Sequence, residues 1–544
     1  MGSSRYIKVI LPVRLEWEPV YVTDLNLKPG DRVRVAMANK EYVGVVHICD
    51  IEPDVAQERI HPVSGIAEGL PSISAEELKF WEFLSGYYLC SLGEIYNAAY
   101  PGSRIRSEET AARIAARKKE SEDRTVAPDS GSSGNQTASP ESERVPKPSA
   151  FPKPSVIISP DRYEMYVSKA RETLATGRGV LFLVPETALG DNLQNALRDE
   201  FGGSLLIYSS RQTPVRRRKT AELLRDMTAP ELVIGTRSAL FLPFRDLGLI
   251  IVDEEQDPSY KQTEPNPRYN GRDAAVVLGK IHGAEVLLGT SCPSFETEVN
   301  LKNSKYNLVR NERKPLEAMI IDTVDERAKN GMVGMFSRKL IEEIRKADET
   351  VLVRGWEKPE EIAGAISELF PGKNVTVRTA SAAQNELGRV SLIAVLQADA
   401  FFRKEDFRSD ERSMQMLYRL AARADKLVVQ TGKSAHPVFR ADARAISTML
   451  EERKAFNMPP FERFADVCIS DTNEGRLKKM SYNLSKALSA PAMKIPVDGG
   501  IRFRIALPRG SGATAIKLNI RSAVLRIERE FNYRSHIFID VDPI

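Results

Sequence analysis

A series of short apolar segments between residues 156 and 288 constrains the fold of this chain more than any other feature. The segments have the length of strands, are separated by stretches with helical periodicity, and include 180–184, 205–208 and 249–252. They are apolar throughout rather than alternating with polar residues, which is the pattern of strands buried on both faces. Strands of this kind that alternate with helices predict a parallel α/β sheet.

The remaining segments predict a multidomain α/β protein with a small β-rich N-terminal domain and a C-terminal α+β domain. The N-terminal part alternates apolar and charged residues around turns, and its first helix begins at Ser74, with Glu77 placed for a capping box. A Ser- and Pro-rich stretch buries too little apolar surface to fold and predicts a disordered linker. The predicted units are the N-terminal domain (1–102), the linker (103–153), a first lobe (154–312), a second, truncated lobe (313–440) and the α+β domain (441–544).

Composition narrows the class of protein only moderately. The 544 residues include 78 Lys and Arg against 74 Asp and Glu, and the resulting net charge of +4 neither demands nor excludes a nucleic-acid partner. Four widely spaced cysteines exclude a disulfide scaffold and a cysteine zinc module. No apolar stretch is long enough for a membrane span and no secretory signal is evident, so we expect a cytoplasmic protein.

An acidic segment, Asp253-Glu254-Glu255, directly follows the apolar strand 249–252. Acids at the carboxyl end of a buried parallel strand lie at the edge where such sheets bind ligands. In ATP-driven motors these positions hold Mg²⁺ and orient the attacking water. An exposed acidic turn explains the same residues equally well.

Motifs around this segment resemble one helicase family. They occur in a fixed order along the chain: Pro185-Glu186, the segment 235–241 (GTRSALF), Asp253–Gln256, the segment 259–262 (SYKQ) and the segment 268–273. This set resembles the first lobe of the primosomal protein N′ (PriA) replication-restart helicase family. Segments 27–35, 87–94 and 539–544 are similar to the two ends of that family. The resemblance implies a DNA 3′-end-binding-like domain followed by two RecA-like helicase lobes.

Departures from the family pattern concentrate in its motor chemistry. The segment 158–166 stands where the P-loop is expected and contains neither a glycine for close approach to phosphate nor a lysine. The eight zinc-binding cysteines are missing, and residues 103–153 stand where a winged-helix domain is expected. We therefore expect no cofactor, neither ATP with Mg²⁺ nor zinc, and we assign no catalytic residue. The remnants of the helicase motifs are Asp253, Glu254, Glu255 and Arg423.

A loop rich in aromatic and basic residues is the first candidate for DNA contact, because rings stack on bases and cations pair with phosphates. Its candidate residues are Tyr260, Lys261, Gln262, Arg268, Tyr269 and Arg272. The alternative is a loop that only packs the first lobe together. Further candidates are Arg32 and Lys40 near the N-terminus and Arg502 and Arg504 near the C-terminus. The basic run 216–219 is explained by a solvated helix face at least as well as by a phosphate track.

The resemblance implies a replication-restart protein that binds forked or single-stranded DNA. With the ATP site dismantled, we expect a platform for reloading the replicative helicase rather than a helicase. The implied partners are DNA, restart proteins and the replicative helicase or its loader, in the nucleoid-associated cytoplasm. Two alternatives stay open: an ATP-dependent 3′-to-5′ helicase with an unusual nucleotide site, and a protein-interaction module without DNA binding.

Overall fold

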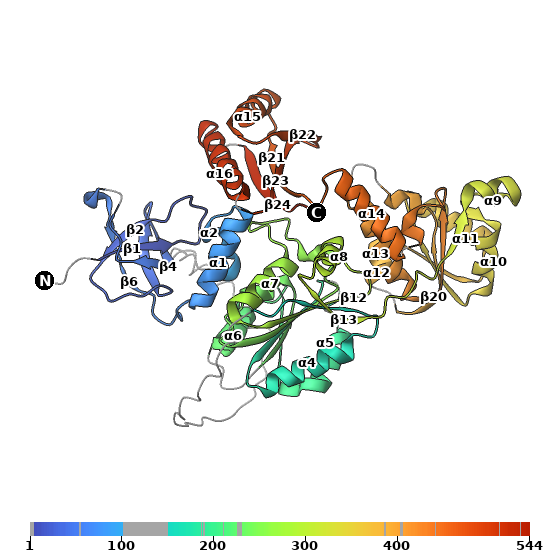
Figure 1. Ribbon diagram of the computed structural model, residues 1–544, viewed down its shortest axis with the longest axis horizontal. Helices are drawn as coiled ribbons and strands as arrows, with labels where there is room; N and C mark the ends of the chain where they lie inside the picture. Colours follow the sequence, from blue (N-terminus) through green and yellow to red (C-terminus); the bar gives the residue numbers. More distant parts are fainter. Residues whose placement is uncertain are drawn as a thin grey trace, which may run out of the picture.

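The computed structural model describes residues 5–53, 56–101, 151–186, 188, 191–209, 211–225, 231–385, 388–402, 406–440, 442–510, 512–533 and 535–544. Almost all of the linker expected over 103–153 lies outside these residues. The described chain forms four sheets of four or more strands, each with its own helices (Figure 1). No helix in the described ranges is long and apolar enough to cross a membrane.

The N-terminal domain is a six-stranded sheet with two helices beside it. Its strands are ordered β5-β2-β1-β4-β3-β6, and the pairs formed by β1, β2, β3 and β4 are antiparallel. The strand bounds are β1 Arg5–Ile10, β2 Val20–Thr23, β3 Arg32–Met37, β4 Lys40–Cys49, β5 His61–Pro62 and β6 Gly65–Ile66. Helices α1 (Ala75–Tyr88) and α2 (Leu92–Ala99) follow, and the predicted capping box of Ser74 and Glu77 is confirmed.

The first lobe is the parallel sheet that the apolar segments predicted. Its seven strands are ordered β13-β7-β12-β11-β8-β10-β9, and every pair is parallel. The strands are β7 Ser155–Ile158, β8 Gly179–Leu183, β9 Leu205–Tyr208, β10 Leu232–Gly235, β11 Leu247–Asp253, β12 Glu285–Thr290 and β13 Asn307–Asn311. The helices are α4 Tyr163–Ala175, α5 Asp191–Phe201, α6 Pro214–Arg225, α7 Gly271–His282 and α8 Phe295–Lys302.

Helices cover both faces of this sheet, which explains why its strands are apolar throughout. Alternate residues of β8 pack in opposite directions: Phe182 joins a core with residues of α4 and α5, while Leu181 joins a core with residues of α6 and α7. Figure 1 shows the two helix layers on opposite sides of the strands. The carboxyl ends of all seven strands meet along one edge, where the residues of interest lie.

The second lobe forms a parallel sheet, and the truncation that the sequence predicted concerns the missing zinc-binding segment rather than this sheet. Its five strands are ordered β14-β20-β19-β17-β18. The strands are β14 Met319–Asp322, β17 Glu349–Val353, β18 Asn374–Arg378, β19 Val390–Val395 and β20 Ala424–Thr431. A small pair formed by β15 (Met332–Val333) and β16 (Phe336–Ser337) lies beside the sheet. The helices are α9 Thr323–Lys329, α10 Arg338–Lys346, α11 Pro359–Leu369, α12 Ala380–Asn385 and α13 Ser409–Ala421.

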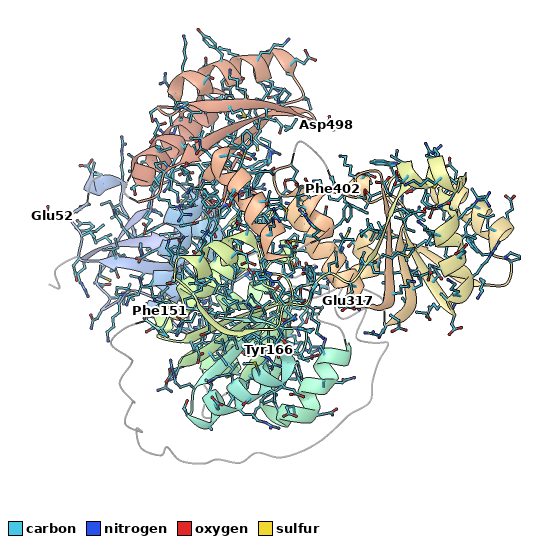
Figure 2. All side chains as sticks on the ribbon, turned by 45° about the vertical axis from the view of Figure 1, so that its right-hand side comes forward. Glu52, Phe151, Tyr166, Glu317, Phe402 and Asp498 are labelled. Carbon is cyan, nitrogen blue, oxygen red and sulfur yellow. The ribbon has the colours of Figure 1, made fainter. Side chains whose placement is uncertain are left out.

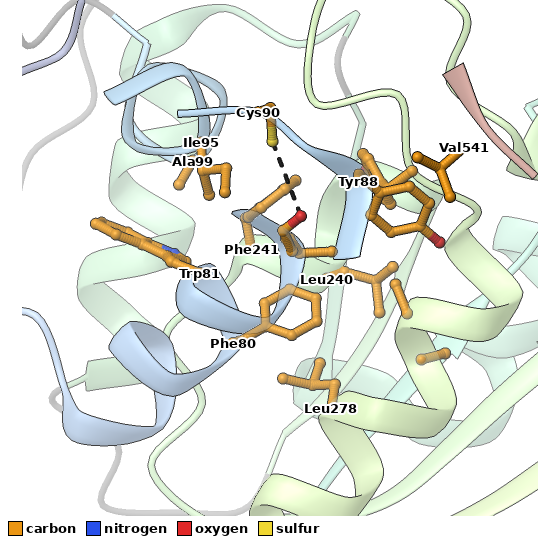
Figure 3. Packing of buried hydrophobic residues seen from close by; sticks show 14 of the residues in the cluster. Phe80, Trp81, Tyr88, Cys90, Ile95, Ala99, Leu240, Phe241, Leu278 and Val541 are labelled. Carbon is orange, nitrogen blue, oxygen red and sulfur yellow. Dashed lines mark hydrogen bonds between the residues drawn. The ribbon is translucent and has the colours of Figure 1, made fainter. Parts of the chain in front are cut away.

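Helix α14 (Ala443–Ala455) leads to the C-terminal α+β domain, an antiparallel sheet ordered β22-β23-β21-β24 with two helices. Its elements are β21 Arg463–Ser470, α15 Glu474–Ala487, β22 Ala492–Val497, β23 Gly500–Leu507, α16 Gly512–Glu530 and β24 His536–Val541. The N-terminal domain, the first lobe and this domain share one buried cluster. Figure 3 shows Val541 beside Tyr88, and Phe80 near Leu278 of α7. The two ends of the chain are thus packed on the first lobe.

Candidate functional site

Arg162 lies at the carboxyl edge of the first sheet, where it pairs with two of the predicted acidic residues. It directly precedes α4, and its Nε lies 2.6 Å from Oδ1 of Asp253, the last residue of β11. Its Nη2 pairs with Oε1 of Glu254. Glu254 has a φ of 48°, in the left-handed region that few residues other than glycine adopt, and this turn brings its carboxylate toward the arginine. The two acids are therefore bridged by one guanidinium.

A glycine allows Arg162 to reach these acids. Strand β12 lies between β7 and β11, so the arginine side chain crosses β12 at Gly289. A Cβ atom at Gly289 would lie 3.1 Å from Cδ of Arg162 and 1.4 Å from the hydroxyl of Tyr166. Tyr166 is labelled in Figure 2 within the first lobe, and its hydroxyl donates to Oδ1 of Asp253 at 2.9 Å. The cluster therefore requires a residue without a side chain at position 289 of β12.

The second lobe contributes another arginine to the same cluster. Arg419 of α13 places Nε 3.3 Å from Oε2 of Glu254 and Nη1 2.8 Å from Oδ2 of Asp257. Burial raises the pKa of Glu254, but the charges of Arg162 and Arg419 outweigh this effect, and the pKa is lowered. Glu254 is therefore ionised and joins the two lobes through its two arginine partners. We call Arg162, Asp253, Glu254, Asp257 and Arg419 the inter-lobe cluster.

A second set of contacts joins the lobes at α8. The backbone N–H of Phe295 donates to Oε1 of Glu411 at 2.8 Å, and Glu296 pairs with Arg408 at 2.8 Å. Burial, Arg408 and Arg272 together leave Glu296 with a pKa of about 2, because the two cations outweigh the cost of burial. The Phe295 side chain is fully buried in the core of the second lobe. These contacts join the two lobes through charged and buried apolar groups.

Glu255 and Arg272 form a buried pair next to the inter-lobe cluster. The Nη1 of Arg272 lies 2.9 Å from Oε2 of Glu255, and the backbone N–H of Ser294 donates to the other carboxylate oxygen at 2.7 Å. Burial raises the pKa of Glu255, although Arg272 and the hydrogen bonds from Ser294 oppose this effect. Arg272 was expected to contact DNA, but it is 6% exposed and its guanidinium is engaged by carboxylates. Its place in this structure is internal.

Lys261, another predicted DNA contact, joins three parts of the chain. Its ammonium lies 2.6 Å from Oδ1 of Asp540 and donates to the carbonyls of Val541 and Arg268 at 2.7 and 2.8 Å. It also lies 5.5 Å from the ring centre of Tyr88. With 3% of its surface exposed, Lys261 holds β24 and α1 against the first lobe and presents no charge to solvent.

The other members of the aromatic loop are also internal, with one exception. The Tyr260 hydroxyl donates to the carbonyl of Asp253 at 2.7 Å and lies 3.1 Å from that of Leu183, and Tyr269 packs on Phe241. The guanidinium of Arg268 lies 3.7 Å from the ring centre of Phe538. These members are buried, whereas Gln262 is partly exposed. The loop therefore contributes to packing, five of its six predicted side chains are buried in this structure, and their contact with DNA stays a prediction.

The predicted contacts outside the loop differ in exposure. Arg32 is 6% exposed and stacks on Tyr100 at 4.2 Å from the ring centre, so it is internal as well. Arg504 makes two hydrogen bonds to Asp466 at 2.9 and 2.7 Å, and Arg502 lies 3.6 Å from the same carboxylate. Lys40 is exposed at the start of β4 and stays a prediction.

Arg423, the remaining helicase remnant, lies between α13 and β20 and is partly exposed. Burial lowers its pKa, and the neighbouring charge of Arg419 adds to this effect, while Glu254 opposes it. Sequence reasoning considered Arg423 as the surviving arginine of its motif and missed Arg419, which makes the inter-lobe contact. It also treated Arg162 only as part of a missing P-loop. Each of these two arginines lies in a motif that otherwise lacks the family's usual residues, and this combination was the available sign of a structural role.

A cavity of 480 Å³ lies between the two lobes and the C-terminal domain. Its lining includes Arg272, Arg408 and Arg463, and each of these is paired with a carboxylate. The cavity therefore presents alternating, mutually compensated charges. Such a lining fits an interface between domains better than a site for a strongly charged ligand.

The geometry defines a class of protein: two parallel α/β lobes carrying an N-terminal domain and a C-terminal α+β domain. Residues 8–101 match the family described as "3'DNA-binding domain (3'BD)" of PriA. Replication restart protein PriA of Rickettsia prowazekii is 27% identical, over 92% of this chain and 92% of its own. The Haemophilus influenzae protein of the same name is 25% identical, over 70% of this chain and 68% of its own. The chain is thus similar over most of its length to proteins named replication restart protein PriA, and its N-terminal domain matches the DNA-binding domain of that family.

Among solved structures, RecG bound to a three-way DNA junction is similar with a TM-score of 0.35 and 13% identity. The similarity covers 55% of this chain and 43% of that one.

Proposed function

We propose that this protein binds forked or single-stranded DNA in replication restart and acts as a platform for reloading the replicative helicase, without unwinding DNA itself. The DNA-binding part is supported by the family match of the N-terminal domain and by the names of the relatives. Restart proteins and the replicative helicase or its loader are the proposed partners, and the bacterial cytoplasm, at the nucleoid, is the proposed location.

One observation carries the proposal of a platform without a motor: Arg162 already pairs with Asp253, the carboxylate placed to hold Mg²⁺, and with Glu254, the carboxylate placed to orient the attacking water. The segment before it also fails to fit a nucleotide. The N–H of Ser159 is bonded to the carbonyl of Thr290 at 3.0 Å, and the Ser159 hydroxyl is bonded to Glu312 at 2.7 Å. Phosphate binding at such a turn needs free backbone N–H groups and a cation. The residues present therefore do not fit ATP with Mg²⁺ in the usual mode.

The test is ATP hydrolysis with and without forked DNA, measured together with fork binding in one preparation of the full chain. We expect fork binding that weakens steeply with salt, and no DNA-stimulated hydrolysis. The variant Asp253→Asn/Glu254→Gln serves as the control, since turnover that persists in it comes from a contaminant. Turnover that the wild type shows and this variant lacks would establish the helicase alternative.

The remaining alternative, a protein-interaction module, predicts no fork binding even at low salt. The platform role is tested separately, by measuring loading of the replicative helicase onto forked DNA coated with single-strand-binding protein. We expect loading to depend on this protein and to proceed when ATP hydrolysis by the chain is undetectable. Loading that is unchanged when the protein is left out would contradict the platform role.

A further inference from the structure

Helix α6 has the strongest charge imbalance of the sequence segments considered above. Its twelve residues, PVRRRKTAELLR, contain five basic residues and one acidic residue, a net charge of +4. The whole chain of 544 residues also has a net charge of +4. Elsewhere positive and negative side chains therefore balance, and α6 stands out as a local concentration of positive charge.

Three of these cations face solvent. Arg216, Arg218 and Lys219 are exposed, and within the described part of the chain they form no ion pair. Arg217 is partly buried and uses its guanidinium on Tyr208, both through a hydrogen bond of 3.1 Å and over the ring. Arg211, just before the helix, is 74% exposed at the side chain and lies 3.5 Å from Glu186. We call Arg211, Arg216, Arg218 and Lys219 the α6 basic surface.

Helix stability does not account for this arrangement. The first turn of α6 contains no acidic residue, so its cations face the positive end of the helix dipole. Cations in the first turn of a helix are unfavourable for this reason, and repulsion between neighbouring cations adds to the cost. An anionic partner that contacts the surface would reverse the sign of both effects.

The opposite end of α6 is fixed on the N-terminal domain. Arg225 donates through Nη1 to the carbonyl of Ser72 at 2.7 Å, and its Nη2 lies 3.3 Å from Glu77. With a helix rise of 1.5 Å per residue, Lys219 and Arg216 lie about 9 and 14 Å along the axis from this anchor. The cations are thus less than one duplex width from the domain that matches the 3'DNA-binding family.

We infer that the α6 basic surface contacts the phosphate backbone of the DNA arm next to the N-terminal domain. The inference rests on the proposed function and identifies the surface that provides much of the protein's affinity for DNA. DNA is favoured over an acidic protein because the surface adjoins the domain with the DNA-binding match, and because exposed cations are the groups that pair with phosphates. The buried aromatic loop offers no comparable set of open cations.

The test compares two triple variants that remove the same charge. The first is Arg216→Gln/Arg218→Gln/Lys219→Gln, and the control is Lys329→Gln/Lys346→Gln/Lys358→Gln. The control lysines are 69%, 67% and 76% exposed at the side chain. They belong to α9, α10 and the start of α11, at the other end of the molecule from α6 (Figure 1). Both variants lower the net charge equally and leave the cores untouched.

We expect the α6 variant to bind forked DNA at least about tenfold more weakly at low salt, while the control binds like the wild type. The slope of log affinity against log salt should fall by about 2 for single-stranded contacts or about 3 for duplex contacts. Equal weakening of both variants would reduce the effect to net charge and overturn the inference. Unchanged binding by the α6 variant would also overturn it and would point to an acidic protein partner. Failure of the wild type to bind would instead refute the proposed function.

Photocrosslinking gives a second readout that does not depend on affinity. Val215, in the first turn of α6, is 67% exposed, and Val324 in α9 is 65% exposed. With p-benzoylphenylalanine in place of either valine, we expect crosslinks to labelled forked DNA from position 215 and none from position 324. Crosslinks from neither position, in protein that still binds DNA, would contradict the inference.

Discussion

Removing Arg162 should loosen the first lobe, because it leaves two carboxylates with one guanidinium too few. The side chain of Arg162 is 11% exposed, and those of Asp253 and Glu254 are 20% and 18% exposed, so water cannot fully replace the lost cation. Breaking one partner of a buried pair costs about 3–5 kcal/mol, and the partial exposure here favours the lower value. We therefore expect Arg162→Ala to lower the opening free energy of β7 and β11 by about 3 kcal/mol.

Native-state hydrogen exchange is the suitable assay, because a chain with several domains does not unfold in a single step. It reports the opening free energy of the strands that hold the cluster. The matched control is Arg171→Ala on α4, whose partner is Glu200 and whose side chain is 61% exposed. We expect that surface pair to contribute no more than about 1 kcal/mol.

A double-mutant cycle with Glu254→Gln isolates the interaction itself. Residues in direct contact couple by about 0.5–3 kcal/mol, and the short buried contact here favours the upper half of that range. Because the pKa of Glu254 is lowered in the folded protein, the coupling is present above the ordinary carboxyl range near pH 4.3 and is lost as pH falls below it. Coupling under about 0.5 kcal/mol at pH 7 would refute the reasoning that Arg162 acts through this acid.

Three further variants test the contacts that hold the domains together. Arg419→Ala should separate the lobes, and we expect the amide of Phe295 to exchange about tenfold faster; unchanged exchange would mean that this arginine is not an inter-lobe contact. Lys261→Met should cost about 3 kcal/mol by leaving a buried carboxylate on β24, with the salt slope of DNA binding unchanged; a shallower slope would favour direct DNA contact. Burial lowers the pKa of His47, but two neighbouring glutamates outweigh it and the pKa is raised. The stability that this pair of contacts adds is complete below about pH 6.5 and is lost as pH rises through the folded pKa, so His47→Gln should flatten the pH dependence seen by thermal unfolding of the N-terminal domain.

The parallel sheet of the first lobe could be predicted because each of its buried strands is a short, continuous apolar segment of the sequence. The second lobe was harder. Its edge strand β14 pairs with β20, more than a hundred residues later, and is only four residues long. Pairing at such sequence separation has no local signature, so the amino-acid sequence alone did not indicate whether this lobe keeps a full sheet.

The residues of the candidate loop could be named from the sequence, but their burial could not be. Aromatic and basic residues at 260–272 suit single-stranded DNA, but the same side chains suit a junction at which one ammonium satisfies several acceptors. Lys261 can form such a junction only because β24, near the C-terminus, and α1, in the N-terminal domain, both pack against this loop. No pattern within the loop distinguishes the two roles.

Asp253 and Glu254 have a structural reason to be acidic that is independent of nucleotide. Replacing either by a neutral residue would leave Arg162 or Arg419 with less compensation at a buried position, which is costly. The reverse also holds, since replacing Arg162 removes the cation that pairs with Asp253, and replacing Arg419 removes the one that pairs with Asp257. An acidic pair after a buried strand is therefore insufficient to indicate ATP hydrolysis when an arginine follows a strand two places away in the same sheet. In this chain the same geometry that brings the two strand ends together, with Gly289 between them, supports internal charge pairing in place of a nucleotide site.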